Sequence, residues 1–177
     1  MAILTQNWPP MAILNPDHLL AQAEKLGTQS GPGAPLQVDL RRAISAAYYA
    51  VFHKILTDAA NQVVGFAHPW EQYNLVYRGI DHRRLREMCN TSLHPTLPEK
   101  YMRCVPDGFS THLKTFAALT VGLQEKRHSA DYDPAIRELK SDATLAINQA
   151  REALRHWSEA LAEERRIFVL LLLFPPR

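Results

Sequence analysis

The sequence predicts an all-α fold, an antiparallel bundle of four to five helices, and three observations lead to this prediction. Strong helix formers such as Ala, Leu, Glu and Arg are plentiful, whereas the 177 residues include only 7 Gly. Apolar residues recur at steps of three and four along several long segments, as they do on one face of a helix. Short connections join these segments, which places consecutive helices antiparallel. A chain of this length suits one domain with a substantial core.

The first helix is expected to begin at Asn15-Pro16-Asp17, because proline and acidic residues favour the first helical turn. Its apolar face ends at Gly27, and residues 28–35 (TQSGPGAP) have the composition of a loop. We expect residues 1–15 to be irregular. The first four residues recur from Met11, which leaves open whether Met11 is an alternative start.

The middle of the chain predicts three further helices. Apolar residues at helical spacing indicate a long second helix over residues 36–61 and a third over 71–89. Residues 90–106 contain three prolines and are expected to form a loop. A fourth helix is expected to begin at Asp107 and to run to about Glu125.

The segment 126–134 is expected to interrupt the helices, with Pro134 in the first turn of a long last helix. That helix either continues into the apolar tail, residues 167–174, or leaves the tail as the one candidate strand. The tail is too short to span a bilayer and therefore has to be buried. We thus divide the chain into an irregular segment (1–15), a helical domain (16–165) and a tail (166–177) that packs on the domain or on a partner.

Composition and motifs exclude several classes of protein. The formal charge is +2, so a nucleic-acid site has to be a local patch. The N-terminus lacks the pattern of a secretory signal, and Cys89 and Cys104 form no C-x-x-C pair, so we expect a cytoplasmic protein with free thiols. A disulfide between the two cysteines is the alternative. Walker, G-x-G-x-x-G and metal-ligand spacings are absent, so we expect no cofactor and no metal site.

The predicted second helix carries an unusual set of polar side chains among small residues. Residues 41–53 read RRAISAAYYAVFH, with paired arginines (Arg41, Arg42), paired tyrosines (Tyr48, Tyr49) and His53. A second polar segment, residues 127–132, reads RHSADY. The polar groups of both segments are either satisfied within a core or part of a functional surface.

Together the two segments resemble the signature of the HEPN superfamily, in particular its bacterial and archaeal branch with R-R-A-x-S-x-A-Y-Y-A-x-F-H and R-x-x-A-D-Y motifs. The resemblance covers roughly residues 15–165 and implies an all-α bundle that forms a homodimer. Many members are metal-independent ribonucleases of toxin–antitoxin, CRISPR or phage-defence systems. Others are noncatalytic partners of a nucleotidyltransferase.

The resemblance implies a set of site residues. Arg127 would hold a phosphate bidentately, with His128 or Tyr132 moving a proton, so these three are the candidate catalytic residues. The candidate binding residues are Arg41, Arg42, Tyr48, Tyr49, His53 and Asp131. Active members carry Arg, then four to six residues, then His, and the position five residues after Arg127 is Tyr132 in this chain. The literal Arg-x-x-x-x-His spacing occurs instead at Arg151 and His156, inside the last helix.

Each of these groups also has a structural interpretation. Tyr48, Tyr49 and His53 are suited to packing between helices, and Arg41 and Arg42 to ion pairs. Asp131 near a helix N-terminus is stabilising without any chemistry. The basic run 82–86 (HRRLR) forms either a solvated helix face or an RNA-backbone patch with Tyr73 or Tyr77 available for stacking.

The sequence therefore predicts a HEPN-domain protein that associates with RNA or nucleotides in a toxin–antitoxin or phage-defence system and that is a candidate metal-independent endoribonuclease. The alternative is a noncatalytic interaction module that partners a nucleotidyltransferase or another protein. The partners expected are a second copy of the chain, an antitoxin or nucleotidyltransferase, and RNA, without a membrane. The identity of the substrate and of the partner stays open.

Overall fold

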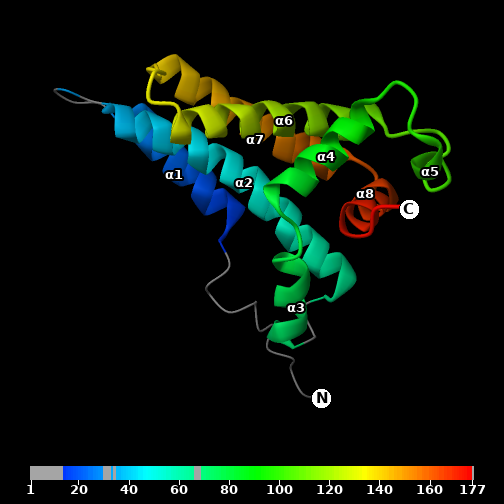
Figure 1. Cartoon of the computed structure of the whole chain (residues 1–177). Coiled ribbons are helices and arrows are strands. Elements are labelled where there is room, and N and C mark those ends of the chain that lie inside the picture. Colours follow the sequence, from blue (N-terminus) through cyan, green and yellow to red (C-terminus); the bar gives the residue numbers. More distant parts are fainter. Residues whose placement is uncertain (1–13, 30–32, 34, 66–68, 177) are drawn as a thin grey trace.

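The computed structural model describes residues 14–29, 33, 35–65 and 69–176 of the chain. Within these residues it contains eight helices and no strand, which confirms the all-α prediction (Figure 1). No helix in the described part is both long enough and apolar enough to cross a membrane. The helices are α1 (Pro16–Thr28), α2 (Gln37–Val63), α3 (Trp70–Tyr77), α4 (His82–Leu93), α5 (Glu99–Met102), α6 (Thr111–Tyr132), α7 (Lys140–Glu159) and α8 (Ala162–Leu173).

Helix α2 lies at the centre of the bundle and packs against α1, α3, α6, α7 and α8. Helices α6 and α7 run alongside each other in opposite directions, with α1 beside α2 (Figure 1). Alanines on the buried faces of α2 and α7, among them Ala43, Ala47 and Ala146, have no exposed surface. Small side chains let helix backbones approach closely, which explains how one helix can have neighbours on several sides.

An aromatic cluster fills the core where α6, α7 and α8 meet. The ring of Trp157 lies 4.8 Å from that of Phe116 and 5.6 Å from that of Phe168, measured between centroids. All three side chains are fully buried. The indole Nε1 of Trp157 donates a 2.6 Å hydrogen bond to a carboxylate oxygen of Asp58, so the one polar atom of the cluster is satisfied and ties α7 to α2.

The prediction of one third helix over residues 71–89 is wrong, because the chain breaks there into α3 and α4. Asp81 caps the N-terminus of α4, and its carboxylate accepts a 2.7 Å hydrogen bond from the backbone N–H of Arg84. A Cβ at Gly79 would lie 3.1 Å from the carbonyl oxygen of Leu75, which explains why glycine suits the bend between the two helices. The break sets α4 against α6 and brings His82 into contact with Tyr48 of α2.

The predicted interruption at residues 126–134 is also wrong. Helix α6 begins at Thr111, after the N-cap Ser110 and later than the predicted Asp107, and continues to Tyr132 without a break. Pro134 lies in the connection to α7, which begins only at Lys140 with Asp142 closing a capping box. The segment Arg127 to Tyr132 is therefore the last part of α6, so Asp131 lies near a helix C-terminus and does not cap a helix N-terminus.

The predicted loop 90–106 and the apolar tail also contain helices. Helix α4 extends to Leu93, and the short α5 follows within the loop. The chain bends at Ala160 and Leu161 instead of continuing α7, and the tail forms α8. The apolar residues of α8 that face the bundle are buried: Phe168, Val169, Leu171 and Leu172. The boundary proposed at residue 15 falls next to residues 1–13, which lie outside the described part, as does Met11.

The two cysteines provide a simple test of the packing. Both are free, Cys89 fully buried and Cys104 exposed, so they form no disulfide. Burial raises the pKa of the Cys89 thiol far above its usual range, and a thiol reacts only as its thiolate. We expect a disulfide reagent such as DTNB to modify one thiol per native chain rapidly, and Cys104→Ala to abolish that reaction. Rapid modification of Cys89 in the native Cys104→Ala protein would contradict this packing.

Candidate functional site

The two polar segments of the sequence meet where α2 packs against α6. The guanidinium carbon of Arg127, on α6, lies 5.2 Å from the ring centroid of Tyr48 and 5.9 Å from that of Tyr49, both on α2. Arg127 is only 7% exposed and Tyr48 is fully buried. A cation this close to two aromatic rings is stabilised by their quadrupoles, more so where water is excluded. We use the name Arg127 cluster for these three side chains and five more that are described below: Ser45, His53, Tyr77, His82 and Asp131.

Asp131 and Ser45 complete the polar side of the Arg127 cluster. Asp131 lies one turn after Arg127 on α6, and its Oδ2 atom is 3.7 Å from Nη1 of Arg127. Its other carboxylate oxygen accepts a 2.5 Å hydrogen bond from the hydroxyl of Ser45 on α2. The buried Nε of Arg127 has no hydrogen-bond partner. The charge of the guanidinium is thus matched, but one of its donors is left without an acceptor, which costs free energy.

His82, the first residue of α4, joins the Arg127 cluster from a third helix. Its Nδ1 atom shares a 2.8 Å hydrogen bond with the hydroxyl of Tyr48, and its ring lies 4.1 Å from that of Phe52, measured between centroids. The side chain of Gln124 donates a 3.0 Å hydrogen bond to the backbone carbonyl of His82 and so fixes α4 against α6.

A second histidine pair extends the same aromatic surface towards α3. Nδ1 of His53 lies 2.6 Å from the hydroxyl of Tyr77, and the two rings stack with centroids 5.9 Å apart. His53 also lies against Tyr49, with ring centroids 6.0 Å apart. The cluster therefore contains one guanidinium and two imidazoles, the imidazoles each bonded to a tyrosine hydroxyl.

Burial controls the protonation of these groups. Desolvation lowers the pKa of His82 below 6.5, and the nearby charge of Arg127 lowers it further, with Asp81 acting in the opposite direction. Desolvation, followed by the charge of His82, lowers the pKa of His53. Desolvation raises the pKa of Tyr48, although Arg127 opposes that shift. Near pH 7 the cluster therefore holds two neutral imidazoles and a neutral phenol beside one fixed positive charge.

Arg41 has a structural position beside the cluster. Its guanidinium donates hydrogen bonds to the backbone carbonyls of Ala130 (3.0 Å), Asp133 (2.9 Å) and Ile136. These carbonyls belong to the end of α6 and the connection after it, where helix geometry leaves acceptors unpaired. Arg41 thus holds the C-terminus of α6 against α2, whereas Arg42, next to it, is exposed.

The structure brings together five of the residues that the sequence suggested, namely Tyr48, Tyr49, His53, Arg127 and Asp131. His128 and Tyr132 lie on the exposed side of α6 with their rings 5.1 Å apart, and Tyr132 is 67% exposed. Both occupy other faces of the helix than Arg127, since successive helical residues are rotated by about 100°.

The literal Arg-x-x-x-x-His spacing in α7 does not form a pair either. The guanidinium of Arg151 lies 2.5 Å from a carboxylate oxygen of Glu24 on α1 and 3.2 Å from the side-chain oxygen of Asn148.

Sequence reasoning missed the part that His82 and Tyr77 play in the cluster. As parts of one predicted helix over residues 71–89, both are expected only on a solvated helix face or in an RNA-backbone patch. The Gly79-Ile80-Asp81 sequence before His82 carries the signal, a glycine followed by an N-cap aspartate, that identifies the break.

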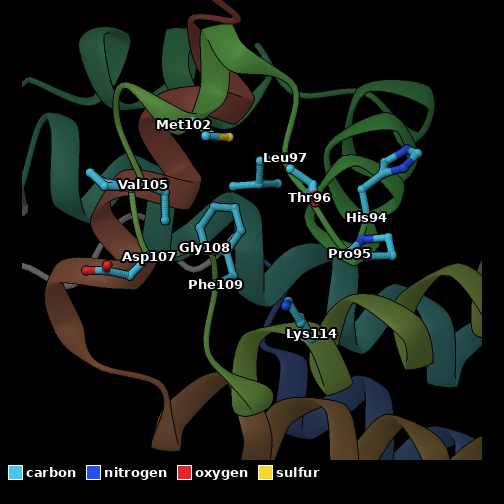
Figure 2. Close-up of a pocket in the computed structure, with 11 residues that line it drawn as sticks. His94, Pro95, Thr96, Leu97, Met102, Val105, Asp107, Gly108, Phe109 and Lys114 are labelled. Carbon is cyan, nitrogen blue, oxygen red and sulfur yellow. The ribbon is translucent and has the colours of Figure 1, made fainter.

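A hollow in the surface lies at the opposite end of α6 (Figure 2). Leu97, Val105 and Phe109 provide much of its apolar lining, with Lys114 beside it (Figure 2). Lys114 precedes Arg127 by 13 residues on one helix, a distance of about 20 Å at 1.5 Å per residue. The hollow is therefore separate from the Arg127 cluster.

No family model, curated protein or solved structure matches the chain. The HEPN resemblance rests on the residues of its two motifs and stays a prediction.

The lowered pKa values of His53 and His82 predict how stability depends on pH. In the unfolded chain both imidazoles bind protons as the pH falls below 6.5, whereas the folded chain resists this. The stabilisation is therefore complete above about pH 6.5 and is lost as the pH falls through the folded-state pKa values. We expect the urea midpoint to fall between about pH 7.5 and 5.5, and less so in a His53→Gln/His82→Gln variant. His94→Gln, which removes an exposed histidine, should keep the wild-type slope. Equal slopes in all three proteins would contradict the assignment.

Proposed function

We propose that the protein is a HEPN-like protein of a toxin–antitoxin or phage-defence system, and that it acts on RNA through the Arg127 cluster. One observation carries the proposal. Two partly exposed imidazoles with lowered pKa values lie in one aromatic cluster with a guanidinium whose Nε has no acceptor. Neutral imidazoles beside a fixed cation are suited to proton transfer near a phosphate.

The chemistry that fits these groups is metal-independent cleavage of RNA. One neutral imidazole takes the proton of a 2′-hydroxyl while that oxygen attacks phosphorus. The bond from phosphorus to the 5′-oxygen breaks, and the imidazolium formed in the first step gives that proton to the leaving oxygen, producing a cyclic phosphate and a 5′-hydroxyl. His82 and His53 would take the part that the resemblance gives to a histidine at the position of Tyr132. Arg127 would stabilise the developing negative charge.

The low exposure of Arg127 limits how RNA reaches it. The residue is 7% exposed, so its charge acts on a phosphate held at His82 and His53, unless Tyr48 and Tyr49 move aside. A second copy of the chain, as the resemblance implies, would add further groups to such a site. The exposed His128 and Tyr132 on the adjacent faces of α6 are available for that contact.

The proposal predicts RNA cleavage that persists in EDTA. We expect His82→Gln to slow cleavage about 100-fold or more, the usual loss on removing a general acid or base. Arg127→Lys should also slow it, because the flexible ammonium of lysine does not hold its charge as the planar guanidinium does against the rings of Tyr48 and Tyr49. His94→Gln is the matched control and should cleave at the wild-type rate. Product analysis by gel, with thermal unfolding of each variant as a check on folding, measures these effects.

A general base with a lowered pKa also sets the pH dependence. Because the neutral imidazole persists below pH 6.5, the acid limb of kcat/KM should lie below that value. If the wild-type protein neither cleaves nor binds labelled RNA, the proposal fails. If cleavage is equal in wild type, His82→Gln and Arg127→Lys, the site assignment fails.

A second candidate function is a noncatalytic module that binds a nucleotidyltransferase or another protein. The observation in its favour is the same low exposure of Arg127, together with its match to Asp131 and to the rings of α2. These contacts account for the motif through the packing of α2 on α6. This candidate predicts no cleavage, a stable complex with the product of a neighbouring gene, and weaker binding after Tyr132→Ala.

A further inference from the structure

A group of potential metal ligands lies at the end of the bundle where α6 begins and α7 ends. His112 belongs to the first turn of α6, and His156 and Glu159 belong to the last turn of α7. The two α7 residues are three positions apart and therefore share a face of the helix. One nitrogen of each histidine and one oxygen of Glu159 lie within 4.8 Å of one another.

The distances between these atoms suit coordination of one ion. Nδ1 of His112 is 3.1 Å from Nδ1 of His156 and 3.3 Å from Oε2 of Glu159. Ligand atoms about 2.0–2.1 Å from a tetrahedral ion lie about 3.3 Å from one another. Two of the three separations therefore already match an edge of the tetrahedron, and small rotations of exposed side chains would adjust the third.

We propose that His112, His156 and Glu159 bind Zn²⁺, with water as the fourth ligand. Two imidazole nitrogens and one carboxylate oxygen form a ligand set that zinc uses in proteins. The negative end of the α7 dipole favours a cation there, whereas the positive end of the α6 dipole, at His112, opposes it. Motif spacing does not reveal this site, because His112 and His156 lie on different helices and form no H-x-x-x-H pattern.

Arg155 and Glu152 determine how readily the site forms. The guanidinium of Arg155 lies 2.6 Å from Oε2 of Glu159, the same oxygen that would bind zinc, and 3.0 Å from Nε2 of His156. In the tautomer whose Nε2 accepts from Arg155, the ring proton of His156 is on Nδ1. Zinc binding at Nδ1 would place that proton on Nε2, which lies 4.0 Å from Oε2 of Glu152, so Glu152 would have to move closer to accept it. Arg155 is therefore a competitor of the metal.

Zinc at this place would join the start of α6 to the end of α7. The same region already contains a contact from α8, whose Glu164 accepts hydrogen bonds from the backbone N–H and the hydroxyl of Ser110, the latter at 2.7 Å. A zinc clamp would add to this contact and stabilise the fold. The zinc clamp lies about 22 Å along α6 from Arg127, at 1.5 Å per residue. The RNA cleavage expected in EDTA therefore does not depend on zinc at this site.

Titration of the untagged full-length protein with Zn²⁺, and with Co²⁺ as a spectroscopic substitute, tests the site. We expect one ion per chain, visible absorption of Co²⁺ at the intensity of a tetrahedral complex, and a rise in Tm with Zn²⁺. His112→Gln and His156→Gln should each weaken Zn²⁺ binding at least 10-fold and remove the rise in Tm. His94→Gln, the matched control, should bind as the wild type does.

Arg155→Gln provides a test with the opposite sign, because removal of the competitor should tighten Zn²⁺ binding at least threefold. Unfolding of each variant in EDTA shows that the fold is intact, and His112 is exposed enough for its replacement to leave the core unchanged. The proposal is overturned if wild type binds no Zn²⁺ at about 100 μM. It is also overturned if His112→Gln and His156→Gln bind as tightly as His94→Gln.

Discussion

A buried guanidinium between two helices is the constraint on which the rest of the structure depends. Arg127 is 7% exposed, and a charge removed from water has to be matched within the protein. Asp131 supplies the opposite charge from the same helix, and Tyr48 and Tyr49 supply two ring faces from α2. Because the matching groups come from two helices, the charge fixes how α2 and α6 lie against each other.

The arrangement of the neighbouring elements follows from this contact. Asp131 can reach both Arg127 and Ser45 only because α6 continues past residue 126, and the three carbonyls held by Arg41 secure the end of that extension. On the other side, Tyr48 bonds His82 and so positions the start of α4. The imidazoles of the candidate site are thus partly desolvated as a consequence of helix packing, and their lowered pKa values have the same origin. The packing of the helices and the proposed chemistry depend on the same side chains. The cluster therefore fits both proposed functions, a ribonuclease and a noncatalytic binding module.

Local patterns in the sequence predicted the α1 and α2 helices closely, because apolar spacing and first-turn residues such as Pro16 and Asp17 act within a few residues. The errors arose where distant contacts decide the outcome. Residues 126–132 have the polar composition of a loop, yet α2 packs against Arg127 and Asp131 and the helix continues. Arg127 and the α2 residues around it could be named in advance because they form a recognisable pair of motifs. His82 could not, since its place depends on how α4 packs after the break at Gly79, and the His112–His156 pair depends on the juxtaposition of two helix ends.

A double-mutant cycle on Arg127 and Asp131, measured by urea unfolding, tests the central claim most directly. Arg127→Met leaves the carboxylate without its partner, and Asp131→Asn leaves the buried guanidinium without its counter-charge, so each should lower the free energy of unfolding by about 2–4 kcal/mol. The double variant has no unmatched charge and should lose less than the sum, with a coupling of about 1 kcal/mol or more. Additive losses, or single losses below about 0.5 kcal/mol, would contradict the claim that Asp131 matches the buried charge of Arg127, on which the rest of the account depends.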